Sequence, residues 1–191
     1  MAGNPIVECI LSRRSIRRYR STPPPMDIVK IVLQCGIHAP TARHCEPWAI
    51  RVVADAAALE KFDGAIVDWM RKTGHAALQF FQNSSQIHVL YHAPLLVVIA
   101  GDRGAPLAQV DCILAMENIL LAAHSFGIGS CIIASVAEFL KNPAGKEWEK
   151  MFQIPKSHEP VIATVLGYSD QEEWPTAVRD GAKIVFVDGE G

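Results

Sequence analysis

The chain has 191 residues, of which 50% are hydrophobic and 20% charged, with a formal net charge of −2 at pH 7. This length suits one domain, and so apolar a composition excludes intrinsic disorder. No apolar run approaches the roughly 20 residues needed to cross a bilayer, so we expect no membrane span. A charge so close to zero also argues against a general attraction to nucleic acid.

Cysteine usage and the N-terminal residues bear on location. The five cysteines are Cys9, Cys35, Cys45, Cys112 and Cys131, an odd number without a CxxC pair. A disulfide framework is therefore not expected, and reduced thiols indicate a cytoplasmic protein. The stretch from Ser12 to Arg20 becomes basic after only a few apolar residues, which argues against a signal peptide.

Hydrophobic spacing in the first quarter of the chain predicts two helices and a strand. One helix begins at Pro5, and a second covers residues 28–35 and is expected to stop at Gly36. The β-branched segment 48–53 predicts a strand.

Residues 55–92 have a weaker pattern. Asp55 is typical of a helix cap, and we expect one helix to about Phe62 and another over 65–82, with Gly64 and Gly74 as interruptions.

The remaining elements alternate irregularly. Residues 95–100 predict a strand buried on both faces, and 111–126 predict a helix so apolar that it is either the central core helix or a dimer interface. Further strands are expected at 128–133, 161–166 and 184–187, with a short helix at 143–152. This order favours a central sheet covered by helices.

The strongest local signal is the run Arg13–Arg20, which holds five arginines within eight residues. Guanidinium groups bind phosphate or carboxylate oxygens in a forked geometry. The run therefore predicts a pocket for one phosphorylated ligand, a solvated basic surface or a nucleic-acid patch. Only Tyr19 interleaves aromatically, which weakens the nucleic-acid reading.

Metal and nucleophile patterns are poor. The spacing of Cys35, His38, His44 and Cys45 fits no standard metal site. His88 and His92 are four residues apart without an acidic residue between them, so core or surface roles are expected there too. We find no GxSxG motif, no convincing Cys–His pair and no paired carboxylates, which suggests that a cofactor supplies the chemistry.

Four segments in order resemble the FMN-dependent nitroreductase family. The run Arg13–Arg17 (RRSIR) is similar to the opening RRSxR signature, and residues 39–48 (APTARHCEPW) to an APSANNRQPW segment. Residues 111–131 resemble the core helix and its glycine turn, and residues 155–168 resemble the late P…PV…LGY stretch.

The resemblance implies an α+β fold in which helices cover a mixed, mostly antiparallel central sheet. It also implies an intertwined homodimer with FMN at the interface, and one domain over residues 1–191 with 55–92 as a variable lid.

The resemblance also implies a site assembled from both chains. The phosphate side of FMN would be held by Arg13, Arg14, Ser15 and Arg17, with Arg179 as a late contact. The other chain would contribute Pro40, Thr41, Ala42 and His44. The flavin ring near N5 would be lined by Ile132, Ile133, Ala134 and Ser135.

Two departures from the family pattern affect this site. Arg43 and His44 stand where asparagines are usual, and Ala134-Ser135 lacks an acidic-glycine pair found in some members. The second departure leaves the preference between NADH and NADPH open.

The implied activity is ping-pong hydride transfer from NADH or NADPH through flavin N5 to a nitroaromatic, quinone or similar planar acceptor. Alternatives are another reaction on the same fold (ene-reduction, dehalogenation or heterocycle oxidation) or a non-catalytic flavin-binding protein. The lid aromatics could stack on a planar acceptor or simply pack in the core; they are Trp69, His75, Phe80, Phe81 and Tyr91.

Overall fold

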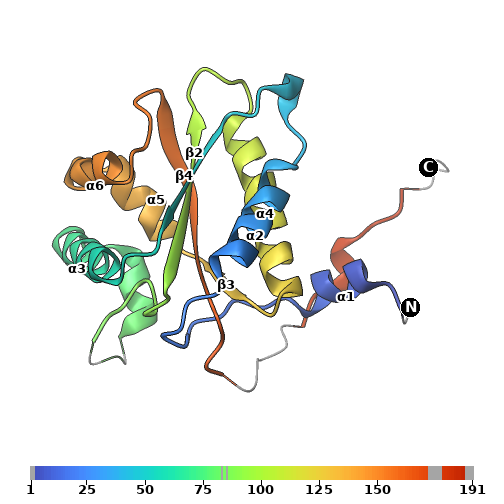
Figure 1. Cartoon of the computed structure of the whole chain (residues 1–191), viewed down its shortest axis with the longest axis horizontal. Helices are drawn as coiled ribbons and strands as arrows, with labels where there is room; N and C mark the ends of the chain where they lie inside the picture. The colour runs from blue at the N-terminus through green and yellow to red at the C-terminus, as the bar shows by residue number, and fades with distance from the viewer. Residues whose placement is uncertain (1–2, 83, 85, 172–177, 188–191) are drawn as a thin grey trace.

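The computed structural model describes residues 3–82, 84, 86–171 and 178–187, and its centre is an antiparallel sheet of four strands in the order β1-β2-β4-β3 (Figure 1). The strands are β1 (Trp48–Val53), β2 (Leu95–Asp102), β3 (Gly129–Ile132) and β4 (His158–Gly167). The helices are α1 (Pro5–Ser12), α2 (Met26–Ile37), α3 (Ala56–Thr73), α4 (Ala108–Ser125), α5 (Ala134–Lys141) and α6 (Lys146–Met151). The predicted α+β class with a helix-covered, mostly antiparallel sheet is confirmed.

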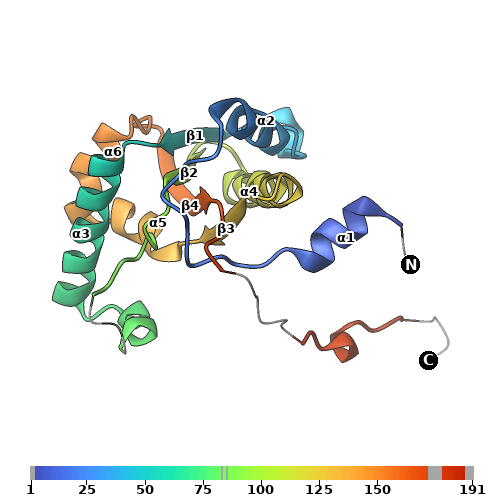
Figure 2. The same ribbon diagram turned by 60° about the horizontal axis from the view of Figure 1, so that its bottom comes forward.

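Helices cover both faces of the sheet. Figures 1 and 2 show α2 and α4 on one face and α3, α5 and α6 on the other. Alternate residues of β2 serve the two layers: Val97 packs with the α2–α4 layer, and Val98 packs with the α3–α5 layer, both with no exposed surface. This two-sided burial explains why the sequence of β2 is continuously apolar.

Helix α4 has the core role that its apolar sequence suggested, and part of its surface is exposed. Met116 and Ile119 lie in the core beneath α2, whereas Val110 and Ile113 are 49% and 46% exposed. One face therefore belongs to the core, and the other is exposed. Among the described helices, none is long and apolar enough to cross a membrane.

The expected role of Gly36 as a helix stop is wrong. Helix α2 continues through Gly36 to Ile37, and a Cβ atom at position 36 would lie 2.6 Å from Cγ1 of Ile119. The glycine therefore permits close packing of α2 on α4, which a local spacing rule does not distinguish from termination.

The expectations for residues 55–82 need correction in part. The Asp55 cap is confirmed, because its Oδ1 accepts the Ala58 N–H at 2.6 Å. However, α3 runs unbroken past Gly64 to Thr73, and a 3₁₀ segment, Ala76–Phe81, follows it. Burial of one face of α3 against the core outweighs the low helix propensity of one glycine.

Two further differences lie in the second half of the chain. Helix α5 was not predicted, although Val136, Phe139 and Leu140 lie on its buried face. The strand expected at 184–187 is wrong: these residues form no strand and are highly exposed, away from the sheet (Figure 2). A β-prone segment becomes a strand only where a partner strand satisfies its backbone.

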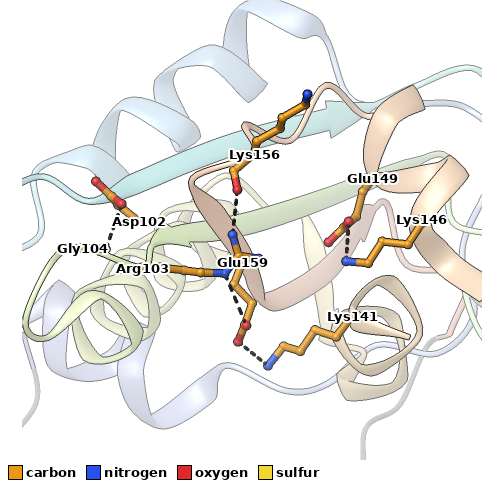
Figure 3. A network of polar contacts seen from close by, with 8 residues as sticks. All are labelled: Asp102, Arg103, Gly104, Lys141, Lys146, Glu149, Lys156 and Glu159. Carbon is orange, nitrogen blue, oxygen red and sulfur yellow. Dashed lines mark hydrogen bonds and ion pairs between the residues drawn. The ribbon is translucent and has the colours of Figure 1, made fainter. Parts of the chain in front are cut away.

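A polar network supports the end of the sheet where β4 begins (Figure 3). Glu159 pairs with Arg103 at 3.8 Å and with Lys141 at 3.4 Å, and Arg103 also donates to the Lys156 carbonyl at 2.7 Å. The network therefore joins the turn after β2, the start of β4 and the end of α5. Exposed pairs of this kind contribute little stability individually.

Candidate functional site

The segment predicted to supply residues 40–44 is fixed to the first turn of α4. The buried carboxylate of Asp111 accepts the Ala42 N–H, with N–O distances of 3.3 and 3.2 Å to its two oxygens. Arg43 and His44 follow with φ angles of 55° and 54°, in the left-handed region that few non-glycine residues adopt. The carboxylate thus holds a strained loop whose following side chains are exposed.

The arginine run is fixed at the opposite end of α4. The Ser12 hydroxyl lies 2.7 Å from Nε2 of His124, and the Ile16 N–H donates to the Ser130 carbonyl at 2.9 Å. Gly129 allows this approach, since a Cβ there would lie 2.6 Å from Cγ1 of Ile16. Close packing against β3 therefore fixes the backbone of the arginine run on either side of Ile16.

The positive charge of the arginine run affects the pKa of His124. Burial lowers the pKa of this imidazole, and the positive charges of Arg13 and Arg14 lower it further. Arg14 also donates to the backbone carbonyls of Leu11 and Arg13, at 2.7 and 2.8 Å. Among the described residues, Arg13 and Arg14 have no acidic partner at ion-pair distance, so their charge at this end of α4 favours an anion.

The two groups of predicted site residues do not come together within one chain. Asp111 and His124 are thirteen residues apart on α4, which corresponds to about 20 Å at 1.5 Å per residue. The loop at 40–44 and the arginine run therefore lie at opposite ends of this helix.

A cavity of about 870 Å³ lies beside the arginine run, between β3, the start of α5 and the segment 75–92. The predicted residues that line it are Arg17, Ile132, Ile133, Ala134 and Ser135. The predicted lid residues that line it are His75, Phe80, Phe81 and Tyr91. Arg13, Arg14 and Ser15 are outside this lining, and Arg179 lies exposed in the C-terminal segment, away from the cavity.

The wall near Arg17 is electropositive. Burial raises the pKa of Tyr91 and of Cys131, and the charge of Arg17 opposes both shifts. Helix α5 begins at Ala134, and among the described residues no side chain caps its first N–H groups. Because those N–H groups carry partial positive charge, this wall is suited to an electron-rich ligand edge.

Several cavity residues were missed from the sequence. Glu138 lies 2.6 Å from Nε2 of His75 and so links α5 to the segment after α3. At the other side, Asp170 lies 3.9 Å from Arg18. The apolar spacing of α5 was the signal that could have placed Glu138 on an exposed helix face.

Trp69 does not belong to the cavity lining. Its ring packs 5.6 Å from Phe139 and 5.0 Å from His75, measured between centroids. The core-packing alternative therefore holds for Trp69, whereas Phe80, Phe81 and Tyr91 are available to a ligand.

Comparison with known proteins agrees with this architecture. The Nitroreductase family model matches residues 10–168, so the chain belongs to the Nitroreductase family. A nitroreductase from Bacteroides fragilis, solved with bound FMN, is 28% identical, with a TM-score of 0.88 over 97% of this chain and 100% of that one.

Two relatives differ in their named activities. An iodotyrosine deiodinase from Thermotoga neapolitana is 24% identical over 172 residues, which cover 83% of this chain and 85% of that protein. An NADH dehydrogenase from Thermus thermophilus is 35% identical over 101 residues, which cover 53% of this chain and 40% of that protein. Family membership therefore leaves the reaction to be argued from the site.

Proposed function

We propose that this protein is an FMN-dependent oxidoreductase that uses NADH or NADPH to reduce a nitroaromatic, a quinone or a similar planar acceptor. One observation carries the proposal: Arg17 and the first turn of α5 open onto the same cavity as the aromatic wall at 80–91. That cavity thus offers cationic and N–H donors on one side and flat apolar surface on the other.

The residues present fit FMN. Arg13 and Arg17 supply charge for a phosphate, and the uncapped start of α5 supplies donors for the polar edge of a flavin ring. Ile132 is 44% exposed at the cavity and offers an apolar surface for a ring face. Bound FMN would supply two-electron redox chemistry, and the FMN-bound relative from Bacteroides fragilis supports this assignment.

A homodimer would complete the site. Since the loop at 40–44 and the arginine run lie about 20 Å apart along α4, both reach one FMN only if each chain contributes one of them. Exposed apolar residues support such pairing: Ile6 and Leu11 on α1 are 69% and 68% exposed, and α4 also has an apolar exposed face.

The acceptor would lie against the segment 75–91, which we propose acts as a lid. Phe80 and Phe81 offer stacking surfaces, and the His75–Glu138 contact ties the lid to α5. The deiodinase relative supports reductive dehalogenation as the second candidate reaction. All five cysteines are free, which fits a reducing cytoplasm.

Reduction and reoxidation of the purified protein test the proposal. We expect a yellow protein whose flavin absorbance is bleached by NADH or NADPH without air and returns on addition of a nitroarene or quinone. Return of colour only with an iodinated phenol would replace the first reaction by the second. A protein that neither contains nor takes up FMN would contradict the proposal.

A further inference from the structure

A second cluster of ligand-type side chains joins the lid segment to α3, outside the residues assigned to FMN. Glu60 comes from α3, and His88 and His92 come from the segment before β2. One ligand atom of each lies within 4.8 Å of the others. The two imidazole rings are 3.6 Å apart between centroids.

The surroundings of this cluster favour a cation. A smaller cavity of about 330 Å³ contains all three side chains together with the buried carboxylate of Asp63. Its described lining includes no Lys or Arg. Within the described part of the chain, neither Glu60 nor Asp63 has a Lys or Arg partner at ion-pair distance.

A buried carboxylate lies beside the His88 ring. Its Nδ1 lies 3.4 Å from Oδ2 of Asp63, while Oδ1 of Asp63 accepts the Leu90 N–H at 2.7 Å. In metal sites, a carboxylate that accepts the N–H of one ring nitrogen leaves the other nitrogen free to bind the ion. Asp63 would do this for Nε2 of His88 once the Nδ1–H turns toward Oδ2.

We propose that Glu60, His88 and His92 bind one divalent transition-metal ion, with Zn²⁺ as the best-matched example. Two imidazoles and one carboxylate form a donor set that suits Zn²⁺ and leaves a fourth position for water. Ligand atoms of a tetrahedral Zn²⁺ site lie about 3.3 Å apart for bonds of about 2.0 Å. Glu60 and His92 are exposed, and ion binding would require their side chains to rotate to this spacing.

The position of this site gives it a consequence for the larger cavity. His88 and His92 line both cavities, so the ion would lie in the wall between them. A bound ion would tie the segment 88–92 to α3 and fix that wall of the acceptor cavity. The sequence argued against metal at His88 and His92 because no acidic residue lies between them, whereas Glu60 and Asp63 precede His88 by 28 and 25 positions.

Calorimetric titration of the full chain with ZnCl₂, after exchange into metal-free buffer, tests the site. We expect one saturable Zn²⁺ per chain, and a Tm that rises with Zn²⁺ concentration. The variant H88Q/H92Q should lose this binding, and Asp63→Asn should weaken it about tenfold or more. Circular dichroism of each variant verifies its fold. None of these readouts depends on flavin activity.

The matched control is H38Q/H158Q, which removes two histidines outside the cluster and should bind Zn²⁺ like the unchanged chain. Co²⁺ substituted for Zn²⁺ should show no thiolate charge-transfer band, since the site contains no cysteine. Equal Zn²⁺ affinity in H88Q/H92Q and H38Q/H158Q would overturn the proposal. So would the absence of saturable binding by the unchanged chain.

Discussion

The two ends of α4 carry different parts of the proposed flavin site by different means. At the N-terminal end, the buried carboxylate of Asp111 holds a strained backbone loop through the Ala42 N–H. At the C-terminal end, packing of Ile16 on Gly129 and the Ser12–His124 contact hold the backbone of the arginine run. The N-terminal end of α4 thus offers a ligand a backbone loop of fixed shape, and the C-terminal end offers it positive charge. In the proposed homodimer, one ligand would contact the N-terminal end in one chain and the C-terminal end in the other.

The largest expected loss of FMN affinity comes from removing positive charge at the C-terminal end of α4. The double variant R13A/R17A should lose two charge-assisted contacts of about 1.5–3 kcal/mol each and so weaken FMN binding about 100-fold or more. Flavin fluorescence titration measures this affinity. Arg20→Ala is the matched control, because Arg20 is exposed in the same run but is not among the residues assigned to FMN. Equal FMN affinities of R13A/R17A and the control would show that the arginine run does not bind FMN.

A smaller loss of FMN affinity is expected from a substitution at the N-terminal end of α4. Asp111→Ala leaves the Ala42 N–H without its acceptor, a cost of about 1–3 kcal/mol, and releases the loop that we assign to the partner's FMN. Both Tm and FMN affinity should fall. Asp111→Asn keeps an acceptor oxygen and should fall less. Unchanged FMN affinity in Asp111→Ala would show that this loop does not contribute.

Removing the Ser12–His124 contact should lower FMN affinity less than R13A/R17A or Asp111→Ala. Ser12→Ala removes the hydroxyl from His124, so urea denaturation should show a loss of about 0.5–1 kcal/mol in the free energy of unfolding. FMN affinity should change only a few-fold, because the arginines remain. A loss of FMN affinity as large as in R13A/R17A would mean that this tether, and not the charge, dominates this end.

The smallest effect is a shift in the pKa of His124. Its folded-state pKa lies below the unfolded value, so its contribution to stability is present above the unfolded pKa and is lost as pH falls through the folded pKa. A phosphate bound at Arg13 would offset the arginine charge and raise this pKa. Proton NMR of the imidazole, with and without FMN, should show that rise. An unchanged value would place the phosphate elsewhere.

Sequence reasoning succeeded where local pattern and tertiary packing agree. The strand at 48–53 and the two-sided burial of β2 follow directly from apolar residues whose pattern matches their packing. The Asp55 cap likewise depends on contacts within one helical turn.

It failed where the decisive neighbour lies far along the chain. Gly36 was predicted to end a helix, because the sequence does not show that it packs against Ile119. The segment 184–187 was predicted to be a strand, because the sequence does not show that no described strand pairs with it. Glu138 was missed because only the fold brings it to His75. The order of residues likewise could not show that the two groups of proposed flavin residues lie at opposite ends of one helix.

Mixing two differently damaged chains tests the two-chain site most directly. Arg17→Ala and His44→Asp would each be made, with His44→Asn as the control for the left-handed position, and the two would be unfolded and refolded together. If each site uses both chains, random pairing restores about one quarter of the sites, and FMN binding and NAD(P)H oxidation return to that level. If each site lies within one chain, every chain is defective and mixing restores nothing, which would contradict the account.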